Sequence, residues 1–314
     1  MVESRTRKTD DRRSGFTLIE LMVVIVIISI LMALILPAIG GAIKNTRIAG
    51  VVNEINQLDS AIARFKADHG IEPPSSIVLC EKSSDWVSTN TAIINSKALI
   101  RQIWPSFDFG DHDINGNGTA DGPITLTLGE CLVFFLGGVN GNDTPGTTAQ
   151  NNIAGQIGPC TGFSKNPASP FDRGGSSREA PLFEFVPSRL TDVNKNGFPE
   201  YKDNLPSQTN PYIYYSGYDG QGYANNGTGV AGEFGSPGLT IPYLQGSTLT
   251  SQPWKPNGHQ IISPGYDRAY GFGGPYLPKT TDPLPVASSG SPTIKERQPE
   301  LDNITNFSNG QLQP

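Results

Sequence analysis

One segment of the chain carries oxygen-bearing side chains at regular intervals. These side chains are Asp113, Asn115, Asn117 and Asp121. Counted from Asp113, they stand at positions one, three, five and nine, and Gly118 stands at position six. Alternating oxygen ligands with a glycine at the sharp turn are the spacing of a calcium-binding loop. Position twelve is Ile124, so a terminal bidentate carboxylate is missing from this loop.

A second segment repeats the spacing more fully. It supplies oxygens at positions one, three, five, nine and twelve, from Asp192, Asn194, Asn196, Glu200 and Asp203. The segment resembles the calcium loop of EF-hands and dockerins, but its flanks and Pro199 do not predict a helix pair. We therefore expect an isolated calcium loop on a β framework. Asn/Gly-rich hairpin turns use the same residue types for backbone reasons, and the sequence leaves that alternative open for both segments.

The third chemically unusual feature of the chain is Glu20, which precedes the apolar run 21–36. A carboxylate in the bilayer costs on the order of 2.5–3.5 kcal/mol on insertion scales, so it usually has a partner and a function. If the chain is cut between Gly15 and Phe16, the new α-amino group lies about one helical turn from Glu20. That amine could pair with the carboxylate in the same subunit or in a neighbour.

The N-terminal segment resembles the prepilin leader of type IV pilins and type II secretion pseudopilins. The residues that carry the resemblance are Gly15, the run Phe-Thr-Leu-Ile-Glu at 16–20 and an apolar stretch that ends at Pro37. The resemblance implies that a prepilin peptidase cuts after Gly15 and methylates Phe16, and that Glu20 acts in assembly. An ordinary secretory signal or a plain membrane anchor are alternatives, but neither explains Glu20.

Charge indicates orientation and partners. Five basic residues precede the apolar run, so the leader should stay in the cytoplasm and the rest of the chain should be exported. Three acidic residues accompany them, so leader removal changes the net charge from −6 to −8. An acidic body argues against nucleic acid as a partner. The resemblance implies other pilin or pseudopilin subunits, a prepilin peptidase, a secretion assembly platform and the cytoplasmic membrane as partners.

A long helix should position these features. Beyond Pro37, apolar residues recur at spacings of three and four, at Ile48, Val51, Ile55, Leu58, Ile62 and Phe65. This pattern predicts an amphipathic helix that ends at His69-Gly70. We expect a leader at 1–15, a transmembrane half of the helix at 16–36, an amphipathic half at 37–70 and an exported head at 71–314.

The head is expected to be rich in strands and loops. The chain holds 36 glycines and 26 prolines, concentrated beyond residue 105, and short aromatic strands alternate with glycine turns from Asn210. A tyrosine cluster indicates one face of a half-buried strand; it comprises Tyr212, Tyr214, Tyr215, Tyr218 and Tyr223. The predicted fold class is α+β: a pilin-like helix packed on an antiparallel sheet with long loops.

The C-terminal segment resembles the last segment of the type II secretion major pseudopilin, which folds around one calcium ion. The matching positions are Ser263, Gly265, Asp267, Asp302 and Thr305. An inserted Asn303 and a Pro/Ser/Thr-rich insertion at 275–299 depart from that pattern. The resemblance implies calcium ligation by Asp267 and Asp302, and plain turn residues are the alternative.

The remaining chemistry is limited. Of three cysteines, Cys131 and Cys160 are our expected disulfide in an oxidising compartment, although sequence cannot establish pairing. The three histidines and the lack of nucleophile, phosphate-loop or zinc-helix motifs argue against an enzyme.

We therefore expect a structural subunit of a type II secretion pseudopilus. A type IV surface or minor pilin is one alternative. A membrane-anchored binding module that recognises a glycan or an exported protein is the other.

Overall fold

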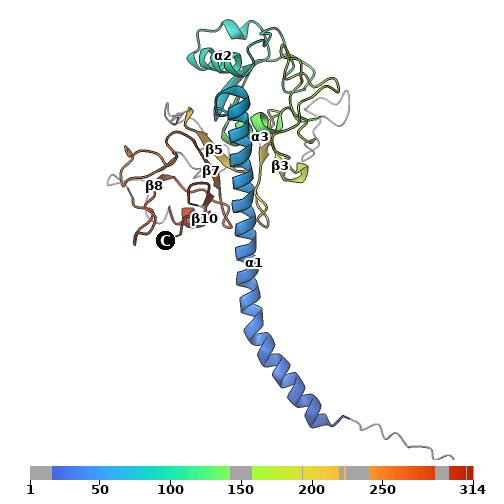
Figure 1. Ribbon diagram of the computed structural model, residues 1–314, viewed down its shortest axis with the longest axis vertical. Coiled ribbons are helices and arrows are strands. Elements are labelled where there is room, and N and C mark those ends of the chain that lie inside the picture. The colour runs from blue at the N-terminus through green and yellow to red at the C-terminus, as the bar shows by residue number, and fades with distance from the viewer. Residues whose placement is uncertain are drawn as a thin grey trace, which may run out of the picture. The chain divides into compact units, whose positions relative to one another are not determined.

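The computed structural model describes residues 16–141, 158–192, 194–218, 223, 241–286, 297–308 and 310–313, without the side chains of 37 and 38 (Figure 1). The leader 1–15, with Gly15, lies outside the described residues. The chain divides into two compact units, residues 1–46 and residues 47–314. The boundary falls inside the predicted amphipathic half, 37–70.

Helix α1 runs from Leu18 to His69, as the sequence predicts. It ends because Gly70 takes a left-handed conformation, with φ of +78°, and donates its N–H to the carbonyl of Lys66 at 2.8 Å. This is the usual glycine termination of a helix.

In the first unit, α1 is apolar on all sides. Its large side chains are exposed, from 43% at Val24 to 76% at Leu18. The helix contains an 18-residue window of mean hydropathy 3.1, so by length and composition it is able to cross a membrane.

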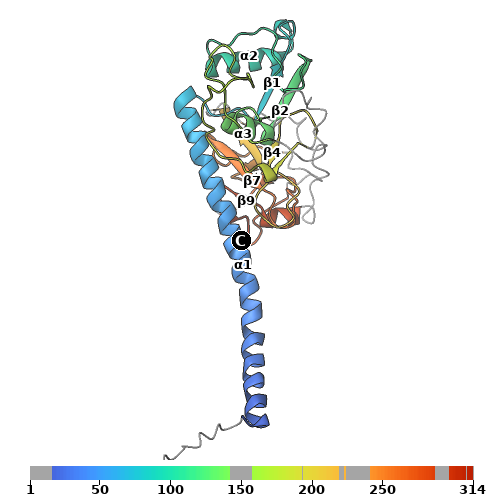
Figure 2. The ribbon, with the colours of Figure 1, turned by 90° about the vertical axis from the view of Figure 1, so that its right-hand side faces the viewer.

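In the second unit, α1 is amphipathic. Five of the six residues predicted to form its apolar face are buried, since Val51, Ile55, Leu58, Ile62 and Phe65 are at most 1% exposed. The sixth, Ile48, is partly buried against the same cluster. Figure 2 shows this half of α1 alongside strands β7 and β9, and the same side chains share one apolar cluster with strand residues. Burying this face is what holds the helix on the head.

The described strands of the head form small sheets. The first pair is β1 (Ser76–Cys80) with β2 (Pro123–Thr127), and the second is β3 (Leu190–Thr191) with β4 (Glu200–Tyr201), both antiparallel. Strands β6 (Tyr243–Leu244) and β8 (Gly274–Pro275) are parallel. In the described part of the head, the helices are α2 (Thr91–Ile103) and α3 (Leu128–Gly137), with short 3₁₀ segments η1 (Asp85–Val87), η3 (Pro187–Arg189) and η5 (Gln298–Asp302).

The largest described sheet has four antiparallel strands in the order β10-β9-β7-β5. Their bounds are Ile213–Ser216 for β5, His259–Ser263 for β7, Ile304–Thr305 for β9 and Gly310–Gln311 for β10. This architecture confirms the α+β prediction.

Strand β5 is buried on both faces, so the prediction of a half-buried strand was wrong. Tyr214 belongs to the apolar cluster that includes α1. Ile213 and Tyr215 belong to a second cluster, with Tyr243, Tyr270 and other C-terminal residues. Residues that follow β5 in the chain cover its second face. The residue pattern within β5 does not indicate that this face is covered.

The predicted disulfide between Cys131 and Cys160 was also wrong, because both cysteines are free thiols. The Cys160 sulfur lies 2.8 Å from where a Cβ on Gly137 would stand. Gly137 is about 9 Å along α3 from Cys131, given the rise of ~1.5 Å per residue. Cys160 therefore packs at the C-terminal end of α3, whereas Cys131 lies near its start.

A charged pair ties α1 to the head. The Glu54 carboxylate accepts a hydrogen bond from Arg189 Nη1 at 2.7 Å and one from the Tyr212 hydroxyl at 2.7 Å. The guanidinium of Arg189 lies 4.2 Å from the ring centroid of Tyr201. The side chains of Glu54 and Arg189 are only 13% and 20% exposed, so each charge depends on the other for solvation.

Replacing Glu54 should destabilise the head strongly. We expect Glu54→Ala to cost about 3–5 kcal/mol in the free energy of unfolding, because Arg189 would be left buried without its carboxylate. Asp68→Ala on the same helix is the matched control. Asp68 is 54% exposed and 3.9 Å from Arg64, so its loss should cost less than about 0.5 kcal/mol. Denaturant unfolding of the full chain in detergent micelles measures both, and equal losses would contradict the assignment of Glu54 as a tether.

Candidate functional site

The first predicted calcium loop closes on its own backbone. The Asp113 carboxylate accepts N–H groups from Gly116 at 2.7 Å, Asn117 at 3.1 Å and Gly118 at 2.8 Å. The Asn115 side-chain oxygen accepts the Asn117 N–H at 3.0 Å. The loop therefore has a fixed conformation that directs its oxygen-bearing side chains.

Two residues that sequence reasoning missed hold this loop. Glu81 is fully buried, and its carboxylate accepts the N–H groups of Ile114 and Asn115 at 2.8 and 2.9 Å. It also accepts the N–H of Asp121 at 2.8 Å. Arg173 donates from Nη2 to the Ile114 carbonyl at 2.9 Å. Glu81 lies on the far side of α2 in sequence, so local spacing gave no signal for its role.

The second predicted loop centres on Asp192. Its Oδ2 accepts the Gly197 N–H at 3.0 Å, whereas its Oδ1 is buried without a hydrogen-bond partner among the described residues. Burial raises the pKa of Asp192. The side-chain amides of Asn194 and Asn196 donate to Glu130 Oε1 at 2.9 and 2.6 Å. Glu130 is 1% exposed and was not anticipated from the sequence.

The other two predicted ligands of this loop are directed elsewhere. The Asp203 carboxylate accepts hydrogen bonds from the Ser263 hydroxyl at 2.6 Å and from Gln208 Nε2 at 2.9 Å. Glu200 lies in β4 and packs its Cγ 3.4 Å from where a Cβ on Gly129 would stand. After burial, the charges of Asp203 and Glu200 are the main causes that raise the pKa of Tyr270. The structure thus brings Asn194 and Asn196 to Glu130, whereas Asp203 is held by Ser263 and Gln208.

The two predicted loops are neighbours in space. Gly197 has a φ of +92°, and a Cβ there would stand 3.1 Å from Asn115 Cβ and 3.2 Å from Asn115 O. Only glycine combines this backbone conformation with so close an approach. The spacing within each loop does not predict this contact.

The C-terminal candidate site pairs two carboxylates. Asp302 Oδ2 accepts the N–H groups of Tyr266 at 2.7 Å and Asp267 at 3.2 Å. Burial, together with the charge of Asp302, raises the pKa of Asp267 to about 6. Thr305 is directed elsewhere, with its hydroxyl 2.7 Å from Ser308 Oγ. Asp267 and Asp302 therefore share one small region where a cation would relieve their repulsion.

Carboxylates alone do not complete a metal cage here. Over the described ranges, no group of three or more His, Cys, Asp or Glu side chains is placed to hold a metal ion. A calcium site would need amide and backbone oxygens as well, which are ordinary calcium ligands.

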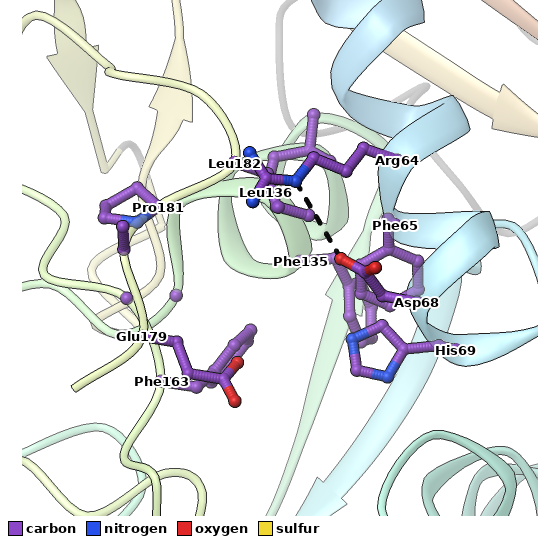
Figure 3. Close-up of a pocket in the computed structure, with 13 residues that line it drawn as sticks. Arg64, Phe65, Asp68, His69, Phe135, Leu136, Phe163, Glu179, Pro181 and Leu182 are labelled. Carbon is purple, nitrogen blue, oxygen red and sulfur yellow. Dashed lines mark ion pairs between the residues drawn. The ribbon is translucent and has the colours of Figure 1, made fainter. Parts of the chain in front are cut away.

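A cavity of about 360 Å³ lies between the end of α1 and α3 (Figure 3). Phe65, Phe135 and Phe163 contribute apolar surface, and the ion pair of Arg64 with Asp68 lies beside it. None of the residues that line this cavity belongs to the predicted calcium sets.

At the other end of α1, Glu20 has a local partner. Its Oε2 accepts the Thr17 N–H at 2.8 Å and the Thr17 hydroxyl at 2.7 Å, and its own N–H donates to Thr17 Oγ1 at 3.3 Å. This reciprocal arrangement is a capping box, which satisfies amides at the start of a helix. Glu20 thus has a structural role that the sequence interpretation did not include.

A known family motif matches the N-terminal segment of the chain. A prokaryotic N-terminal methylation motif matches residues 10–36. The type II secretion system core protein G of Aeromonas hydrophila is 40% identical over 62 residues, which is 20% of this chain and 43% of that protein. The Escherichia coli protein of the same name is 37% identical over 62 residues and is likewise covered over 43% of its length. No solved structure gives a significant match.

A third relative is covered over most of its length. The ComG operon protein 3 homologue of Bacillus licheniformis is 31% identical over 85 residues, which is 27% of this chain and 86% of that protein. Together with the methylation motif and the long apolar helix α1, this match establishes that the chain belongs to the pilin-like family of proteins with a prokaryotic N-terminal methylation motif.

Proposed function

We propose that the protein is a structural subunit of a type II secretion pseudopilus. In this proposal a prepilin peptidase removes residues 1–15, and the mature chains assemble into a helical filament at the membrane. The observation that carries the proposal is the methylation motif at 10–36 running directly into the exposed apolar part of α1. The likeness to two type II secretion core proteins supports a pseudopilus rather than another pilin-like assembly.

The membrane and the head have defined places in this proposal. The apolar part of α1 anchors the chain in the inner membrane, and the basic leader stays on the cytoplasmic side. The head then lies outside the cytoplasm. The protein is a structural subunit and not an enzyme, in keeping with the pilin-like family.

Shearing of intact cells tests the function against its two alternatives. A pseudopilus subunit should release no long filaments, a surface pilin should release long ones, and a membrane-anchored binding module should remain monomeric. Cross-linking in membranes distinguishes the first outcome from the third, because only the pseudopilin should form ladders of its own subunits.

Processing gives the next prediction. The mature protein should begin at Phe16 and carry one added methyl group on its amine, and Gly15→Val should retain the leader. Mass spectrometry of the purified protein measures both. A wild-type chain with an intact leader would contradict processing by a prepilin peptidase.

Glu20 should be required for assembly because its charge pairs with the new amine of a docking subunit. Both Glu20→Ala and Glu20→Gln should be processed and inserted, yet fail to assemble, since each leaves a cation unpaired in a low-dielectric bundle. Glutamine is the informative variant because it still completes a capping box with Thr17. If Glu20→Gln forms cross-linked ladders like wild type while Glu20→Ala does not, capping rather than charge pairing is the function of Glu20.

Calcium is the proposed cofactor of the head. Asp267 and Asp302 would hold one ion, because their shared region favours a cation. Asp192 would bind a second, with Glu130 beside it, because Asp192 Oδ1 is a buried oxygen without a hydrogen-bond partner among the described residues. The first loop, at Asp113, would bind a third. Each ion would neutralise carboxylates and tie loops that bury little apolar surface.

Calcium should raise the melting temperature of the full chain in detergent. The expected gain is about 2.7 kcal/mol when calcium is a hundredfold above its dissociation constant, and magnesium should substitute poorly. Asp267→Asn and Asp192→Asn should each remove part of the gain, and Asp68→Asn should remove none. Equal melting temperatures in calcium and in chelator would indicate that the loops are plain turns and not calcium sites.

The calcium effect should also depend on pH. Because the pKa of Asp267 is raised to about 6, its folded carboxyl holds a proton below that pH and a negative charge above it. At low pH, calcium must displace the proton from the Asp267 carboxyl. At high pH, calcium neutralises the charge of the Asp267 carboxylate. The gain should therefore shrink as pH falls through about 6.

A further inference from the structure

His259 of β7 lies between two carboxylates that belong to α1 and the segment after it. Its Nε2 is 2.8 Å from Asp59 Oδ1, and its Nδ1 is 3.6 Å from Glu72 Oε2. The side chains of His259 and Glu72 are only 12% and 8% exposed. A single imidazole therefore bridges two acidic groups in a largely dry setting.

Two buried atoms of this group face each other without a hydrogen bond. Neither His259 Nδ1 nor Glu72 Oε2 has a hydrogen-bond partner among the described residues. A neutral imidazole has one N–H and can donate to only one of the two carboxylates. A doubly protonated imidazolium donates to both, so the arrangement suits the charged form.

Two lysines and two tyrosines surround this group. Lys66 Nζ is 3.5 Å from Glu72 Oε1, and Lys255 Nζ is 3.9 Å from Asp59 Oδ2. From β5, the Tyr214 ring lies 5.8 Å from the imidazole, and its hydroxyl donates to the Pro73 carbonyl at 2.7 Å. The hydroxyl of Tyr223 donates to the Lys255 carbonyl at 2.7 Å. Both lysines are 42% exposed, so solvent screens them more than it screens His259.

The same carboxylate also receives the C-terminal segment. Asn306, just after β9, donates from Nδ2 to Asp59 Oδ1 at 3.0 Å and to the His259 carbonyl at 3.1 Å. Asp59 is thus the point where α1, β7 and the residue following β9 meet. A change in the charge of His259 therefore alters the contacts between all three elements.

We propose that His259 is a pH-sensitive clamp that holds the C-terminal half of α1 on strands β7 and β9, closed when the imidazole carries both protons. The clamp is independent of the proposed secretion function. It makes the attachment of the helix to the sheet respond to acidity in whichever compartment holds the head.

The direction of the response follows from proton linkage. Burial opposes the charged imidazole, but pairing with Asp59 and Glu72 outweighs it and raises the pKa of His259. A raised histidine pKa gives stability that is fully present below the unfolded value, about 6.5. That stability is lost as pH rises through the higher folded value.

Nuclear magnetic resonance of the full chain in detergent micelles, with labelled histidine, measures the protonation of His259 directly. The chain has three histidines, and His259→Gln identifies the signal of His259 by its loss. We expect the His259 signal to titrate above the ordinary value of about 6.5, and Glu72→Gln to lower its midpoint by about one pH unit, a tenfold change in proton affinity. A midpoint at or below about 6.5 would overturn the proposal.

Thermal unfolding between pH 5.5 and 8.5 supplies a second measurement. The melting temperature of wild type should fall from about pH 6.5 upwards, and the fall should be smaller in Glu72→Gln. His112→Gln, outside the clamp, should keep the wild-type dependence. If Glu72→Gln retains the full wild-type dependence, the clamp does not control stability and the proposal fails.

Discussion

The head depends on burying one face of α1 while that helix also carries charges at its border. Glu54 and Asp59 lie beside the apolar face, and neither is fully solvated. A partly buried carboxylate is tolerated only where a partner meets it, so each acts as a fixed point for a different part of the head. Glu54 pairs with Arg189 and Tyr212, near β3 to β5. Asp59 contacts His259 and Asn306, near β7 and β9. Apolar contacts alone would permit the helix to slide or rotate along the sheet, whereas two polar anchors define a single register.

Local pattern was sufficient for the helix and insufficient for the loops. The apolar spacing from Ile48 to Phe65 and the terminal Gly70 fixed the end of α1, because helix periodicity and helix termination are properties of neighbouring residues. The calcium-like spacings gave the loop conformations at Asp113 and Asp192, but not the carboxylates that complete them. Glu81 and Glu130 come from distant elements, and spacing within a loop carries no information about them. The contact of Asp203 was not predicted for the same reason, since its carboxylate accepts a hydrogen bond from Ser263, 60 residues away.

The candidate sites share one principle: acidic groups are arranged around backbone amides and around each other. Glu81 and Asp113 accept backbone N–H groups. Asp302 does so as well, but its charge also raises the pKa of Asp267. The first arrangement makes a stiff turn with or without an ion. The second stores electrostatic repulsion that an ion or a proton relieves. The two kinds of loop can therefore differ in how much they need a cation, although their sequences look alike.

The four-stranded sheet places β9, from residues beyond 300, in its interior. Strand β9 lies between β7 and β10, and Asn306 reaches Asp59 across a sequence separation of 247 residues. Contacts of such high contact order form late, because most of the chain must be present before they exist. The sheet therefore cannot be completed while residues beyond 300 are still within the ribosome or a translocation channel. Until then the apolar face of α1 lacks part of its cover, and the unfinished head is the stage at which a chaperone would be needed most.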